Sequence, residues 1–162
     1  MADGTRKSEV TIARAERSDL QAILALQYLA FQSEAELLGD FSLPPLTQTY
    51  EEIVREYEKG LFLKALDANH DIVGSVRAHA DQDTAFIGKL VVHPARQGRG
   101  IGAELLLAVE QECPRARYEL FTRGSNERTV RLYERLGYVR FREQAMSSAL
   151  TFVYLEKSRA PL

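Results

Sequence analysis

Apolar residues recur along this chain with two different spacings, and the first part of the chain shows both. Residues 10–15 alternate between apolar and polar types, which predicts a short strand. From Leu20 to Leu26 the apolar residues recur at helical spacing, and Ser18 or Asp19 before them is a suitable helix cap. We therefore predict a helix that runs from this cap to about Gln32.

A second helical pattern follows a polar and acidic segment that ends at Pro44 and Pro45. Thr47 or Thr49 can cap this helix, and Gly60 is the residue expected to end it. Beyond Gly60 the spacing changes to two, which indicates strands separated by turns, together with two further amphipathic helices. Strands are predicted at 61–66, 72–78, 85–92, 118–122, 138–142 and 150–155, and helices at 100–112 and 126–136.

This order of elements predicts an α/β (α+β) fold. The strand, helix and strand between residues 85 and 122 form a parallel crossover, which is expected to be right-handed, whereas the hairpins around it are antiparallel. We expect a mixed, mostly antiparallel sheet of roughly six to seven strands with about four flanking helices. Residues 1–8 are expected to be loose, and residues 9–158 to form a single domain, because the chain shows no repeat, low-complexity tract or linker.

Composition narrows the class of protein further. With 45% hydrophobic and 27% charged residues, the 162-residue chain is typical of a globular protein. A net charge of −2 disfavours a nucleic-acid binder. The single Cys113 excludes an intrachain disulfide, and the scattered histidines form no zinc motif, so no metal is expected. The sequence shows no signal peptide and no membrane-spanning run, so we expect a cytoplasmic protein without a membrane partner.

The sharpest feature is the glycine-rich turn from Gln97 to Gly102, between a predicted buried strand and an amphipathic helix. Its glycines at alternate positions permit positive φ angles and the close approach of a ligand. Free N–H groups at the helix start favour a phosphate, and Arg96 and Arg99 add positive charge. The spacing differs from the dinucleotide and P-loop motifs. A merely structural turn is the alternative, but one glycine would serve for that, so we interpret the turn as a pyrophosphate site.

Two stretches of the chain, QGRGIG at 97–102 and LYERLGY at 132–138 after Asn126, resemble the signatures of the GNAT superfamily of acyl-coenzyme A-dependent N-acyltransferases. Residues 97–102, QGRGIG, match the Q/R-x-x-G-x-G/A motif of that family, and LVVHP at 90–94 is similar to its strand before the loop. Asn126 and LYERLGY at 132–138 resemble its second signature, an Asn followed by L-Y-x-x-x-G-F/Y. The resemblance is strongest from residue 85 to residue 138, and the order of elements agrees with a GNAT-like fold.

The resemblance implies an enzyme that transfers an acetyl group from acetyl-coenzyme A to a primary amine by direct attack on the thioester. It implies that loop amides hold the pyrophosphate and that backbone groups of Leu90 and Val92 pair with the pantetheine arm, as an added strand does. Asn126 would contact this arm, although it is equally suited to cap the next helix. The cofactor-binding residues that follow are Leu90, Val91, Val92, Gln97, Gly98, Arg99, Gly100, Ile101, Gly102, Ala103, Asn126 and Tyr133.

Tyr133 is the catalytic residue that the resemblance implies, because the family has a tyrosine beside the sulfur. A thiol of pKa about 8.5 and a phenol near 10 are close enough for the phenol to protonate the departing thiolate. The alternative is that Tyr133 only packs its helix against the sheet. The base for the amine stays open, because the strand at 85–89 lacks the glutamate of many family members. The candidates are His79, Asp81, Glu34, Glu36 and a water relay.

Acidic residues dominate the segment between Tyr28 and Glu58, near which members of the family bind the acceptor. This favours a small cationic amine, although a solvated helix face explains the same charges. Glu34, Glu36 and His79 are the substrate-binding residues that we predict. Two other functions stay open, a non-catalytic acyl-coenzyme A sensor or partner module and a protein or peptide N-acetyltransferase. A homodimer is expected only by analogy with the family.

Overall fold

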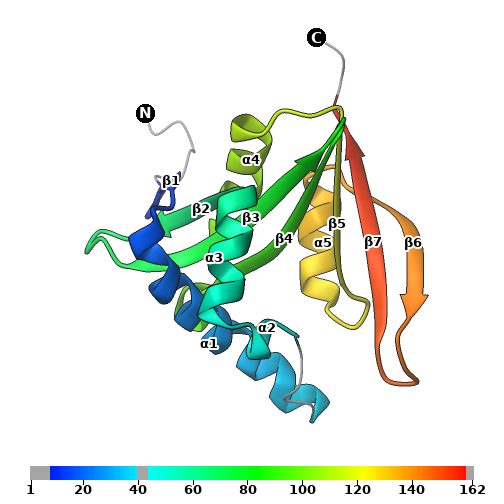
Figure 1. Ribbon diagram of the computed structural model, residues 1–162. Coiled ribbons are helices and arrows are strands. Elements are labelled where there is room, and N and C mark those ends of the chain that lie inside the picture. The colour runs from blue at the N-terminus through cyan, green and yellow to red at the C-terminus, as the bar shows by residue number, and fades with distance from the viewer. Residues whose placement is uncertain (1–7, 40–43, 160–162) are drawn as a thin grey trace, which may run out of the picture.

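The computed structural model describes residues 8–39 and 44–159. A seven-stranded sheet runs through the molecule, and helices pack on both of its faces (Figure 1). The strands are β1 (Thr11–Arg14), β2 (Leu61–Leu66), β3 (Ile72–Asp81), β4 (Thr84–Val92), β5 (Arg117–Arg123), β6 (Val139–Ala145) and β7 (Thr151–Ser158). The helices are η1 (Arg17–Asp19), α1 (Leu20–Leu38), α2 (Pro44–Thr47), α3 (Tyr50–Lys59), η2 (Pro94–Arg96), α4 (Ile101–Glu112) and α5 (Glu127–Arg135).

The sheet has the strand order β1-β2-β3-β4-β5-β7-β6. Every neighbouring pair is antiparallel except β4 and β5, which are connected through α4 and run parallel. The predicted mixed, mostly antiparallel sheet with one parallel crossover is therefore confirmed.

The strands β4 and β5 pair only near their beginnings. Their register runs from Thr84 opposite Arg117 to Phe86 opposite Glu119. Beyond this point β4 remains hydrogen-bonded to β3, and β5 remains hydrogen-bonded to β7. The two strands consequently diverge, as Figure 1 shows, and the sheet is open between them.

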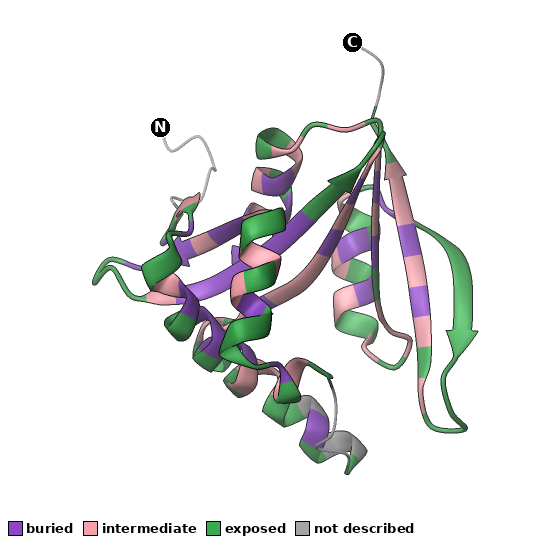
Figure 2. Cartoon of the chain, viewed as in Figure 1, coloured by how far each residue is buried: buried purple, intermediate pink, exposed green. Residues whose placement is uncertain are grey.

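Two hydrophobic cores hold the helices to opposite faces of the sheet. The larger core contains Leu105 and Val109 of α4 and Tyr133 of α5, packed on the strands. The smaller core contains Ile23 of α1 and Ile53 of α3, packed on the other face. Buried and more exposed residues alternate along β7 (Figure 2), which shows the period expected of a strand with one covered face. Each fully buried aliphatic side chain contributes roughly 1.5–3 kcal/mol to folding.

Local sequence explains where the first helices begin and end. The helix α3 begins after Thr49, whose Oγ1 accepts the N–H of Glu52 at 3.2 Å, while the carboxylate of Glu52 accepts the N–H of Thr49 at 2.9 Å. The helix α1 was predicted to end near Gln32 but continues to Leu38, where Gly39 with a φ of 67° ends it. Part of the predicted polar segment is therefore helical.

The segment after α1 holds one more short helix, because α2 begins at Pro44, and proline is favoured in a first helical turn. The predicted loose N-terminus lies outside the described residues, apart from Ser8, and so does the acidic Asp40. None of the helices in the described ranges is both long and apolar enough to cross a bilayer.

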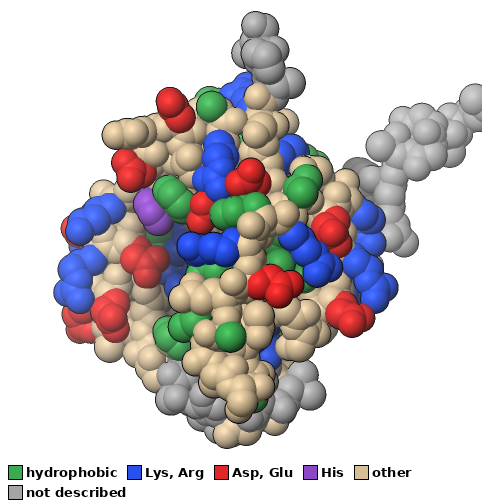
Figure 3. Space-filling view, turned by 90° about the vertical axis from the view of Figure 1, so that its right-hand side faces the viewer, with side chains coloured by type: hydrophobic (Ala, Val, Ile, Leu, Met, Phe, Trp, Pro, Cys, Tyr) green, Lys and Arg blue, Asp and Glu red, His purple; other side chains and the backbone are tan. Residues whose placement is uncertain are grey.

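The strand β6 forms one edge of the sheet, and all of its residues are exposed. On the face that carries β6 and β7, basic, acidic and hydrophobic side chains are interleaved (Figure 3).

Candidate active site

A cavity of about 340 Å³ opens between the end of β4, the glycine-rich turn and the helices α4 and α5. The fold thus brings both signature stretches of the sequence to one place. The predicted cofactor-binding residues that line this cavity are Leu90, Val92, Gln97, Gly98, Gly100, Ile101, Gly102, Ala103 and Asn126.

The geometry of the turn suits an anion. Gly98 and Gly100 have φ angles of 78° and 83°, in the left-handed region that favours glycine. The first backbone hydrogen bond of α4 joins the N–H of Glu104 to the carbonyl of Gly100 at 3.1 Å. The N–H groups of residues 101–103 precede it and have no acceptor within the helix. Together with the helix dipole, these donors favour a phosphate group.

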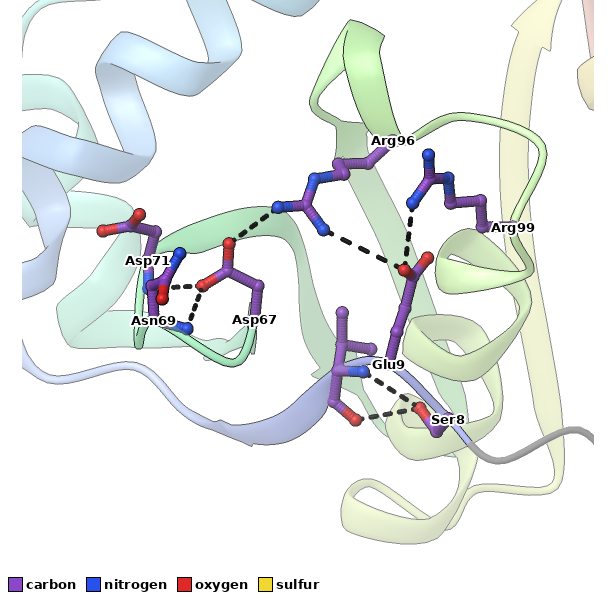
Figure 4. Close-up of polar contacts among 8 residues, drawn as sticks. Ser8, Glu9, Asp67, Asn69, Asp71, Arg96 and Arg99 are labelled. Carbon is purple, nitrogen blue, oxygen red and sulfur yellow. Dashed lines mark hydrogen bonds and ion pairs between the residues drawn. The ribbon is translucent and has the colours of Figure 1, made fainter.

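The two arginines of the turn are already engaged by acidic side chains. Figure 4 shows Arg96 reaching Asp67, with 2.9 Å between the charged groups, and both Arg96 and Arg99 reaching Glu9, at 3.9 and 3.1 Å. Backbone N–H groups, first of all that of Asp71, hold the pKa of Asp67 below its usual value. The positive charge predicted at the turn is thus shared with carboxylates, and Arg96 lines the cavity whereas Arg99 does not.

Two arginines of α5 line the cavity as well, and sequence reasoning missed them. They are Arg128 and Arg135, which lie two helical turns apart and so share one face of the helix. A Cβ atom built at Gly98 would come within 2.8 Å of Nη2 of Arg128, so the loop and α5 are close together. The spacing of Arg128, Leu132 and Arg135 by four and three residues marks this face in the sequence, but only the folded chain brings it to the loop.

Asn126, Val91 and Tyr133 were all predicted to contact the cofactor, but their surroundings differ from one another. Asn126 lines the cavity, and its Oδ1 also accepts the N–H of Thr129 at 3.3 Å, so capping and ligand contact are compatible. Val91 is buried in the larger core, which leaves its backbone for contact with a ligand. Tyr133 is 5% exposed, its ring centroid is 6.1 Å from that of Tyr138, and it lines none of the cavities described here.

The strand β4 carries a β-bulge beside the cavity. Its register against β3 shifts so that Lys89 and Leu90 both oppose Val76. Lys89 has a φ of 52°, which is uncommon for a residue with a side chain. A bulge redirects the backbone N–H groups next to it, and such a backbone conformation is typical of functional sites.

A second cavity, of about 660 Å³, lies on the face of the sheet covered by α3. It reaches the point where β4 and β5 diverge, so the two cavities flank the opening from opposite faces. The polar and aromatic side chains in its lining are Glu56, Lys59, Phe62, Arg77, His79, Phe86, Lys89, Glu119, Phe121 and Tyr154.

One side of this cavity is a network around Arg77, which is 6% exposed. Its guanidinium donates to Gln27 at 2.6 Å, to Gln48 at 3.1 Å and to Glu56 at 3.0 Å. It also lies 4.6 Å from the centroid of the Phe62 ring. Burial lowers the pKa of Arg77, and the carboxylate of Glu56 opposes this effect. The buried charge is thus compensated, which fixes these side chains in place.

His79 is the predicted substrate residue that lines the second cavity, where its ring stacks on Phe86 with 5.3 Å between the centroids. Glu36 is exposed on α1 and lies outside the lining. The side chain of Glu34 falls outside the part of the chain that the structure describes. Asp81, at the end of β3, is exposed and does not line the cavity.

Few of the acidic residues that dominate the segment from Tyr28 to Glu58 lie at the second cavity. Among the acidic residues of α3, Glu56 lines the second cavity. Glu52 caps its own helix, and Glu58 pairs with Arg17 at 3.0 Å on the surface. A solvated helix face therefore explains most of these charges in the described residues.

Lys89 and Glu119 line the second cavity but were not singled out from the sequence. Burial lowers the pKa of Lys89, and the positive charge of Arg77 adds to the effect. Glu119 pairs with Arg117 at 2.9 Å. Alternation along residues 117–121 places Glu119 on the face opposite the buried one. The sequence does not show where the pairing of β5 with β4 ends, because that depends on tertiary structure.

The chain belongs to the acetyltransferase (GNAT) family, whose family model matches residues 21–138. The resemblance drawn from the two signatures is therefore confirmed. Among curated relatives, the YqkA protein of Bacillus subtilis is 27% identical over 139 residues, which cover 85% of this chain and 38% of that protein. This chain thus spans well under half the length of that relative.

Solved structures agree with this family. The ribosomal-protein-S18-alanine N-acetyltransferase from Escherichia coli superposes with a TM-score of 0.76 at 20% identity, covering 94% of this chain and 96% of that one. The PaiA N-acetyltransferase from Thermoplasma acidophilum, solved in complex with coenzyme A, superposes with a TM-score of 0.75 at 17% identity, covering 94% and 100%. At such identities these neighbours establish the GNAT fold.

Proposed function

We propose that this chain transfers an acetyl group from acetyl-coenzyme A to the primary amine of a small molecule. The observation that carries the proposal is the opening between β4 and β5, which has a cavity on either face of the sheet. A long donor can reach through this opening from the side of α4 and meet an amine on the side of α3.

The first cavity fits the diphosphate end of coenzyme A. The N–H groups of residues 101–103 supply neutral donors, and Arg128 and Arg135 supply positive charge. The left-handed glycines let the diphosphate approach the backbone without a Cβ in the way. The bound coenzyme A in the PaiA neighbour supports the same assignment for this chain.

The free edge of β4 is suited to the pantetheine arm. Leu90 and Val92 line the first cavity, and their backbone groups can pair with the amides of the arm as an added strand would. When bound, acetyl-coenzyme A supplies the activated thioester carbonyl. A backbone N–H redirected by the bulge at Lys89 and Leu90 can polarise that carbonyl, and such a donor stabilises a transition state by about 3 kcal/mol.

Two proton transfers accompany the attack. An alkylamine of pKa about 10.4 must first become neutral, which costs about 4.6 kcal/mol at pH 7. His79, which lines the second cavity, or a water molecule that it orients, would take this proton. Tyr133 returns a proton to the departing thiolate. Its helix α5 also carries Thr129 and Leu132, which line the first cavity.

The second cavity suits a small acceptor. Its volume of about 660 Å³ falls within the usual range for small-molecule sites, roughly 300–1,000 Å³. This volume favours a small amine over a protein substrate as the acceptor.

Release of free thiol from acetyl-coenzyme A, measured over polyamines, amino acids and short peptides, tests the proposal. We expect Tyr133→Phe to lower kcat about 100-fold, because proton transfer to sulfur is lost. Tyr138→Phe is the matched control, since this buried phenol bonds to Glu110 at 3.1 Å, and we expect its kcat to stay within about threefold of the unmodified protein.

The same assay separates the alternatives. An unchanged kcat in Tyr133→Phe would assign that residue to packing alone. Tight binding of coenzyme A without turnover of any acceptor would favour an acyl-coenzyme A sensor. Turnover confined to the peptides would favour a protein acetyltransferase.

A further inference from the structure

The charged groups that line the second cavity are not equally available to a ligand. Glu56 and Arg77 form an ion pair at 3.0 Å, and the amide of Gln48 also donates to Glu56. Glu119 is paired with Arg117, which binds Glu156 as well, at 2.7 Å. Both carboxylates of the cavity therefore have cationic partners of their own.

Two lysines in the lining have no such partner. Within the described residues, neither Lys89 nor Lys59 takes part in an ion pair or a side-chain hydrogen bond. Lys59 is exposed at the end of α3, where water solvates its charge. Lys89 is half-buried, and burial and the positive charge of Arg77 lower its pKa, whereas the carboxylate of Glu56, which is already paired with Arg77, opposes this effect. An unpaired, half-buried cation of this kind is stabilised by an anion.

Lys89 also lies close to the backbone that we assign to the acetyl donor. It lies in the bulge of β4, next to Leu90, whose backbone we assign to the donor. The aromatic rings of Phe86 and Phe121 line the same cavity and offer apolar surface beside this charge. A ligand that spans the cavity therefore meets an anion-binding group, an apolar wall and the opening between β4 and β5.

We propose that the acceptor carries, besides its amine, a compact anionic group such as a carboxylate, which pairs with the ammonium of Lys89. The acceptor is then a zwitterion of the amino-acid type rather than a plain cation, with its amine directed to the opening and its apolar part against the aromatic rings. This inference rests on the proposed function, because it concerns the acceptor of the same reaction.

Matched acceptors test the inference. Each of a set of L-amino acids with apolar side chains is compared with its own amide and its own decarboxylated amine, and kcat/KM for acetylation is measured. We expect the unmodified protein to favour the best amino acid over its amide at least about tenfold, mainly through KM. In Lys89→Gln this ratio should fall to about one, whereas Lys89→Arg, which keeps the charge, should retain a preference for the acid. Lys59→Gln, on the solvated rim, should change the ratio less than about threefold.

A binding measurement keeps this test separate from catalysis. In calorimetry of the protein saturated with coenzyme A, the same amino acid should bind at least about tenfold more tightly than its amide, and Lys89→Gln should remove that difference. Equal affinity for acid and amide, or an unchanged preference in Lys89→Gln, would overturn the inference and leave the acetyltransferase assignment intact. Selective binding of the acid through Lys89 without any thiol release would instead support the inference and count against the proposed function.

Discussion

Gly100 lies where the glycine-rich turn becomes α4, and its φ angle is 83°. A Cβ built at this position meets no atom within 4 Å, so lack of space does not explain the glycine. The backbone conformation does, since a left-handed φ costs most other residues roughly 1–2 kcal/mol and costs Asn and Asp less. The position also faces the free N–H groups at the start of α4, where a negative side chain would compete with a ligand.

Substitution of Gly100 by Asp or by Asn separates charge from backbone strain. The two side chains have nearly the same shape and tolerate left-handed φ, but only Asp places a negative charge at the helix start. We expect Gly100→Asp to bind coenzyme A at least about tenfold more weakly than Gly100→Asn, a difference of about 1.4 kcal/mol in calorimetry. Equal affinities would contradict an anion site at this turn.

Glu56 makes the stability of the fold depend on pH. Burial alone would raise the pKa of Glu56, but the charge and hydrogen bond of Arg77 outweigh burial and bring this pKa below 4.5. The folded-state pKa is thus lower than that of the unfolded chain. The pair therefore stabilises the fold fully above pH 4.5, and this contribution is lost as the pH falls below that value.

The variant Glu56→Gln tests this linkage. At pH 7 we expect the free energy of unfolding in urea to fall by about 1–2 kcal/mol, less than for a fully buried pair because the Glu56 side chain is 40% exposed. The deficit should shrink steadily as the pH falls below 4.5, because protonation of Glu56 removes the charge of the pair. The control Glu58→Gln, whose pair with Arg17 is on the surface, should cost less than about 0.5 kcal/mol. A deficit that is constant with pH would contradict the assignment.

At the scale of elements, most boundaries followed from local sequence, and the exceptions have local causes. Both Thr47 and Thr49 are plausible caps by composition, and the structure selects Thr49, because Glu52 lies three residues after it and completes a capping box. The extension of α1 to Leu38 was missed because a polar surface can belong to a helix or to a loop. Only the left-handed Gly39 marks the end.

The cap of α3 can be tested with a pair of threonine variants. Thr49→Ala removes a side-chain acceptor at the helix start and should lower the free energy of unfolding by about 1 kcal/mol. Thr47→Ala should cost less than about 0.5 kcal/mol, because the exposed Thr47 hydroxyl donates to the carbonyl of Pro44, at 3.3 Å, and caps no helix start. Chemical denaturation measures both, and equal losses would argue against the capping box.

At the scale of the whole molecule, the sequence was sufficient for the mixed sheet, the crossover and the glycine turn, because each depends on short-range patterns. It was not sufficient for contacts between distant segments. Asp67 and Glu9 reach the arginines of the turn only after folding. Arg128, Lys89 and Glu119 acquire their positions from the meeting of α5, β4 and β5, for which no local pattern exists.

The divergence of β4 and β5 predicts a pattern of hydrogen exchange. Amides of β4 beyond Phe86 that point toward β5 have no strand partner, so they should exchange quickly in the free protein. Saturation with coenzyme A should slow exchange in β4 and in residues 97–103, since both would then donate to the ligand. The strands β1 and β2, far along the sheet, serve as an internal control. Protection spread evenly over the sheet would contradict a donor site at the opening.

The cavities on opposite faces of the sheet also have a kinetic consequence. Two reactants that arrive by separate routes do not block each other, so neither product has to depart before the second reactant arrives. Double-reciprocal plots of initial rate should then consist of intersecting lines, and no acetylated form of the protein should accumulate when the donor is supplied alone.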